Sequence, residues 1–160
     1  MGWTLVFGIT LGLAWALFTL AAIDVLAFRL PDLVTLPLAA GGLVASLILT
    51  NEIWAHLAGA VIGYCAFAAI SWAFARLRGR EGLGQGDAKL AAAAGAWLGW
   101  TPLPSVVLIA CAAGFLWVAA MAIVRGRAAL TERIPFGVAL AIAIWVVWLY
   151  GPLEILSAAA

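Results

Sequence analysis

Long stretches without a single charged residue restrict what this chain can fold into. Five segments contain no Lys, Arg, Asp or Glu: residues 3–23, 33–50, 53–75, 90–124 and 134–153. Apolar residues make up 68% of the 160 positions and charged residues 9%, whereas soluble domains average about 45–50% and 25%. This composition excludes a water-soluble domain and predicts an integral membrane protein.

The lengths of the uncharged segments predict the number of helices, because a bilayer core needs about 20 apolar residues per span. Residues 90–124 are too many for one span, and they divide at the two prolines of 101–104, since proline ends helices. The division leaves a short fourth helix, 90–100, and a full fifth. We therefore predict an all-α, polytopic bundle of about six transmembrane helices, in one domain covering residues 1–160. A bundle of this size is compatible with a monomer.

The basic residues predict the orientation of this bundle. All eight Lys and Arg follow the first, third or fifth predicted helix, so they lie on one side, and the positive-inside rule makes that side cytoplasmic. We expect a multi-pass protein of the cytoplasmic (inner) membrane with both termini on the periplasmic side. Five tryptophans fall near the outer boundary, as in an aromatic belt: Trp3, Trp54, Trp97, Trp100 and Trp148.

Two acidic residues lie at the predicted cytoplasmic ends of helices. Asp24 follows the first uncharged segment, and Asp87 ends Gly84-Gln85-Gly86-Asp87, just before the short fourth helix. A carboxylate at membrane depth costs roughly 2.5–3.5 kcal/mol on insertion scales, which makes it a functional candidate. The alternative is that both are solvated loop charges beside helix ends.

The short fourth helix favours the functional interpretation of Asp87. Residues 90–100 rise only about 16 Å, so we expect the segment 84–87 to enter the membrane as irregular backbone around a water-accessible pocket, with Gly84 and Gly86 permitting the tight path. In such a pocket an ionised carboxylate activates water while a protonated one polarises the scissile carbonyl. The sequence has no Cys or His cluster, and we expect neither a metal nor a cofactor.

Four segments resemble one known family. Residues 24–32, 35–38, 84–90 and 134–137 read DVLAFRLPD, TLPL, GQGDAKL and IPFG. They are similar, in order and spacing, to the motifs of the type IV prepilin peptidase (leader peptidase) family, which are GxGD aspartic membrane proteases. The resemblance implies an aspartic endopeptidase that removes the basic leader from type IV prepilins, or from type II secretion pseudopilins, at the cytoplasmic membrane boundary.

Roles for individual residues follow from the same resemblance. It implies that Asp24 and Asp87 are catalytic and that Gly84, Gly86 and Lys89 belong to the active-site loop. Lys89 can equally be read as a positive-inside anchor. We interpret Asp32 as an N-terminal cap of the second helix.

The resemblance also predicts the partners. The expected substrate has a basic leader followed by an apolar helix, and Asp32, Glu81 and Glu132 are candidates for attracting that leader. Lipid is the other partner, and nucleic acid is not expected. Residues 1–160 contain no counterpart of the cytoplasmic domain that longer family members use for methylation, so we expect the short form of the family and consider N-methyltransferase activity doubtful. The alternative from another class is a non-enzymatic membrane carrier or assembly subunit that relays protons or ions through its acids.

Overall fold

The computed structural model describes residues 2–27, 30–78, 84–125 and 135–153, and every regular element in this part of the chain is an α-helix. The six helices are α1 (Trp3–Ala27), α2 (Asp32–Leu49), α3 (Ile53–Arg78), α4 (Gln85–Leu98), α5 (Leu103–Arg125) and α6 (Phe136–Tyr150). The all-helical class is confirmed, and the described residues form six helices. The break between α4 and α5 falls where the prolines predict it.

The helices differ in how much of a membrane they can cross. Helices α1, α2, α3 and α5 are long and apolar enough for a span. Helix α4 has 14 residues and α6 has 15, which corresponds to about 21–23 Å of rise. Both are therefore shorter than a hydrocarbon core of about 30 Å.

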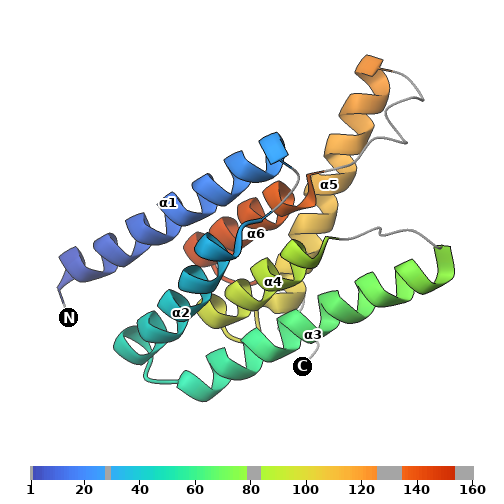
Figure 1. Cartoon of the computed structure of the whole chain (residues 1–160). Coiled ribbons are helices and arrows are strands. Elements are labelled where there is room, and N and C mark those ends of the chain that lie inside the picture. The colour runs from blue at the N-terminus through green and yellow to red at the C-terminus, as the bar shows by residue number, and fades with distance from the viewer. Residues whose placement is uncertain (1, 28–29, 79–83, 126–134, 154–160) are drawn as a thin grey trace.

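Helix α4 lies in the middle of the bundle. Figure 1 shows α1 and α3 running toward the right of the view, α2, α4 and α6 running back toward the left, and α5 leaning away from the others. Helix α4 packs against α3, α2 and α6, and most of its residues are buried. Its position explains its many alanines, because small side chains let neighbouring helices approach closely.

Three glycines bring the backbones of α3 and α4 into direct contact. Gly59 and Gly63 are four residues apart on α3, a spacing that permits close helix approach in membranes, and Gly95 lies against them on α4. A Cβ atom added at Gly95 would lie 2.1 Å from the carbonyl of Gly59, and one added at Gly63 would lie 2.4 Å from the carbonyl oxygen of Ala91. Any side chain at these positions would separate the helices.

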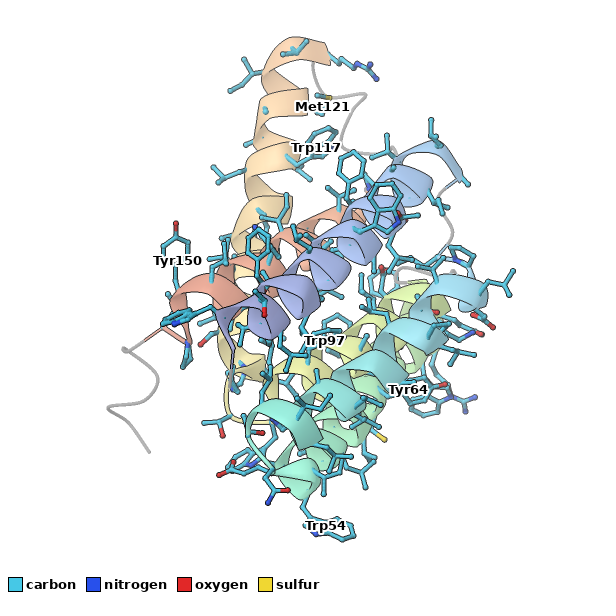
Figure 2. All side chains as sticks on the ribbon, turned by 90° about the vertical axis from the view of Figure 1, so that its left-hand side faces the viewer. Trp54, Tyr64, Trp97, Trp117, Met121 and Tyr150 are labelled. Carbon is cyan, nitrogen blue, oxygen red and sulfur yellow. The ribbon has the colours of Figure 1, made fainter. Side chains whose placement is uncertain are left out.

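Trp97 joins α4 to two further helices. Its indole Nε1 donates a 2.7 Å hydrogen bond to the carbonyl of Leu38 on α2, and its ring meets Trp148 of α6 edge-on with centroids 5.5 Å apart. Figure 2 shows Trp97 inside the bundle, whereas Trp54 points outward. The prediction that Trp97 belongs to an aromatic belt is wrong, because this indole has its hydrogen-bond partner inside the protein.

The end of α4 that lies away from the acidic residues is also held. Nδ1 of the buried His56, on α3, donates to the carbonyl of Ala96 at 3.0 Å. The last carbonyls of a helix have no partner within the helix. His56 therefore satisfies one of them and connects the end of α4 to the start of α3.

Replacing Gly95 by Ala should destabilise the fold. The added Cβ would collide with backbone atoms of Gly59, which cannot move away as a flexible side chain can. We expect a loss of roughly 1–3 kcal/mol, the usual range for overpacking, measured as a lower midpoint of thermal unfolding in detergent.

Gly12→Ala is the matched control. Gly12 lies inside α1 with no atom within 4 Å of an added Cβ, and Ala is favoured over Gly in a helix interior. The midpoint should stay the same or rise. Equal midpoints for the Gly95→Ala protein and the original chain would contradict the close α3–α4 contact.

Candidate active site

Asp24 is buried in the last turn of α1. Leu17, Leu20 and Asp24 are the buried residues of this part of the helix, and their spacing places them on one face. The side chain of Asp24 is only 4% exposed, and its Oδ2 accepts a 3.2 Å hydrogen bond from the backbone N–H of Val138 in the first turn of α6. The first N–H groups of a helix lack partners within the helix and favour negative charge. The start of α6 therefore stabilises the Asp24 carboxylate.

Asp87 is buried as the third residue of α4. Its Oδ2 accepts a 3.3 Å hydrogen bond from the backbone N–H of Gly84, the residue that precedes the helix. A carboxylate at this position commonly closes the N-terminus of a helix in this way. The expectation of irregular backbone over 84–87 is wrong beyond Gly84: the helix begins at Gln85, five residues before the predicted start.

The structure brings the two carboxylates together. Asp24 and Asp87 come from different helices, and they are close enough for the charge of Asp24 to act on Asp87. Both are buried, and a backbone N–H donates to each of them. Such an arrangement is costly to bury. Two neighbouring acids held in this way are suited to acid–base chemistry.

Leu30 lies between the helices that carry or contact these acids. A Cβ atom added at Gly86, next to Asp87, would lie 3.0 Å from Cβ and Cδ1 of Leu30. A Cβ added at Gly137 would lie 3.1 Å from the same Cδ1 and 2.7 Å from Oδ2 of Asp24. The two glycines therefore let α4 and α6 approach Leu30, and one of them also leaves room for a carboxylate.

Lys89 and Asp32 form an ion pair between the starts of α4 and α2. Pro31 occupies the N-cap position of α2, and no side chain caps that helix end. The interpretation of Asp32 as a helix cap is therefore wrong, because its carboxylate binds Lys89 instead. Gly84, Gly86 and Lys89 lie at or next to the first turn of α4.

An open groove of about 340 Å³ lies between α3 and the first turn of α4. Small side chains, two aromatic rings and one amide surround it: Tyr64, Ala68, Ser71, Trp72, Ala75, Gln85 and Ala88. Gln85 lies two positions before Asp87 and Ala88 directly after it. The groove therefore reaches the same turn of α4 as the buried acid.

Leu30 and Val138 also belong to this site, and the sequence pattern does not indicate either of them. Val138 directly follows the motif at 134–137, but nothing in that motif indicates that the N–H of Val138 donates to Asp24. Several residues used in the sequence argument lie outside the described part of the chain: Arg29, Arg80, Glu81, Arg127, Glu132, Arg133 and Ile134.

Curated relatives share much of this sequence. A prepilin leader peptidase/N-methyltransferase of Burkholderia pseudomallei (strain 1026b) is 49% identical over 127 residues, covering 79% of this chain and 41% of the relative. Proteins of the same name from Aeromonas hydrophila and Pseudomonas aeruginosa are 41% and 39% identical, covering 87% and 94% of this chain and 48% and 52% of their own lengths. The chain thus spans about half the length of the curated relatives it matches.

The model of one protein family matches more than half of the chain. No solved structure matches the fold significantly. The model of the type IV leader peptidase family matches residues 11–119, which include both buried aspartates, the groove and the whole of α4. This chain belongs to the type IV leader peptidase family.

Proposed function

We propose that this chain is an aspartic endopeptidase of the cytoplasmic membrane that removes the basic leader from type IV prepilins or type II secretion pseudopilins. One observation carries the proposal: Asp24 and Asp87 are buried on separate helices, near enough for the charge of Asp24 to act on Asp87. The names of the relatives, prepilin leader peptidase/N-methyltransferase, support the peptide substrate. Two paired carboxylates can carry out peptide hydrolysis, so only the peptidase activity is proposed for this chain.

The chemistry needs one proton shared between the two acids. Two like charges at one site disfavour double ionisation, so one carboxyl is protonated and the other is ionised. The ionised carboxylate takes a proton from water as the hydroxide attacks the scissile carbonyl carbon, while the protonated carboxyl donates a hydrogen bond to the carbonyl oxygen. When the C–N bond breaks, the leaving nitrogen receives the proton that was taken from water. The second carboxyl keeps its own proton, and the pair returns to its starting state.

The surroundings suit a substrate that arrives within the membrane. The outward faces of α1, α2, α3 and α5 expose large apolar side chains, as lipid-facing helices do, so a substrate with an apolar helix can lie against them. The groove beside Gln85 and Ala88 gives an extended peptide a way to the turn that carries Asp87. Gly84, Gly86 and Lys89 shape this turn in the proposal, and residues 1–160 form one peptidase domain.

The basic residues orient the site in the proposal. Arg76 and Arg125 lie near the C-terminal ends of α3 and α5, as Asp24 does in α1, and Lys89 lies two residues after Asp87 in α4. Basic residues gather on the cytoplasmic side of a membrane. The active site then faces the cytoplasm, where the basic leader of a prepilin is located.

Asp24→Asn and Asp87→Asn should each abolish leader removal while the protein still inserts into the membrane. Each substitution removes a proton-transfer group, and such groups contribute about 10²–10⁴-fold to rate. The measurement is the size of a co-expressed prepilin on a gel, with membrane levels of each variant compared by immunoblot.

Two control variants test whether the loss of processing is specific to Asp24 and Asp87 or follows from removing any acidic residue. Glu52→Gln makes the same chemical change at an exposed position in the α2–α3 turn and should leave processing unchanged, and Asp32→Asn should leave much of it. Normal leader removal by the Asp24→Asn protein would refute the mechanism. A proton carrier would instead lose transport in these variants with no effect on prepilin size.

The orientation has its own test. With Cys65 and Cys111 replaced by Ala, Glu52→Cys should react with a membrane-impermeant maleimide in intact spheroplasts. Arg76→Cys should react only after the membrane is opened. The reverse pattern would place the paired acids on the outer side and contradict the proposed localisation.

A further inference from the structure

The described residues that lead into α2 lie against the candidate active site. We define the strap as residues Leu30, Pro31 and Asp32. Pro31 has φ −71° and occupies the N-cap position, and its carbonyl accepts hydrogen bonds from the N–H groups of Val34 and Thr35. Because the proline ring fixes φ and the helix begins directly after it, the strap is a rigid extension of α2.

Leu30 touches neighbours of both acids. Its Cδ1 lies where a side chain at Gly86 or Gly137 would begin. Gly86 directly precedes Asp87, and Gly137 lies against the carboxylate of Asp24. One methyl group is therefore packed between the helix that carries Asp87 and the helix whose N-terminus holds Asp24.

An ion pair also holds the strap to α4. Asp32 pairs with Lys89, one half-turn beyond Asp87 on α4. Both side chains are partly exposed, and ion pairs of this kind contribute little stability by themselves. The ion pair instead fixes the position of the strap along α4, and Leu30 fixes the distance between the strap and α4.

We infer that Leu30 is a positioning residue that sets the separation of the Asp24 and Asp87 carboxylates. Protein interiors are close-packed, so a side chain between two helices determines how near they come. Removing it leaves a cavity into which the surroundings partly relax. A displacement of about 1 Å in a catalytic group can cost 10²-fold in rate. The inference rests on the proposed function, since it assigns Leu30 to the chemistry of those two acids.

The test compares three leucine variants on a prepilin in detergent. Leu30→Ala should lower kcat at least about tenfold with little change in KM, because the acids shift while the surface that binds the substrate stays. Leu30→Met, which nearly keeps the volume, should restore most of kcat. Leu13→Ala is the matched control: Leu13 is fully buried in α1, three turns from Asp24. It should lower the unfolding midpoint and leave kcat of the folded protein near the original value.

Each result decides between a positioning and a structural role. Loss of kcat in Leu30→Ala with recovery in Leu30→Met supports the inference. An unchanged kcat in Leu30→Ala, a loss that appears only in KM, or equal kcat losses in Leu30→Ala and Leu13→Ala would overturn it. Failure of the original chain to process any prepilin would refute the proposed function instead, so the two failures are distinguishable.

Discussion

Contact between the backbones of α3 and α4 is the interaction on which the rest of this structure depends. Lipid is as apolar as leucine, so helices in a membrane associate through close packing rather than through exclusion of water. Gly59 and Gly95 allow that packing at its closest. Helix α4 is thereby enclosed by α3, α2 and α6, and its first turn, which carries Asp87, is held inside the bundle instead of at its surface.

Much of the fold could be predicted from the sequence, because the cost of charge in lipid leaves a clear pattern. The uncharged segments locate every helix, and the prolines at 102 and 104 locate the break between α4 and α5. Asp24 and Asp87 could be singled out for the same reason: they are acids at the edges of these segments. Their proximity could not be predicted from these positions, and their catalytic role is a proposal.

The remaining details depend on contacts between distant segments, which periodicity and charge do not reveal. Helix α4 starts earlier than charge predicts because Asp87 itself satisfies the N–H of Gly84, so an acid that looked like the end of a loop is part of a helix. Asp32 has the residue type and position of a cap, yet Lys89, 57 positions away, binds it. Leu30 is an ordinary apolar residue in the sequence, and only the three-dimensional fold shows that it touches both Gly86 and Gly137.

The hydrogen bond from Val138 to Asp24 limits how far the chain can be shortened while the surroundings of the two acids stay intact. The segment shared with the family model ends at residue 119, and it contains both aspartates. The donor to Asp24, however, belongs to α6, which starts at Phe136. A fragment cut at the end of the shared segment would keep both acids but would leave the Asp24 carboxylate without this donor. The smallest fragment that retains the surroundings of the pair therefore extends at least to the first turn of α6.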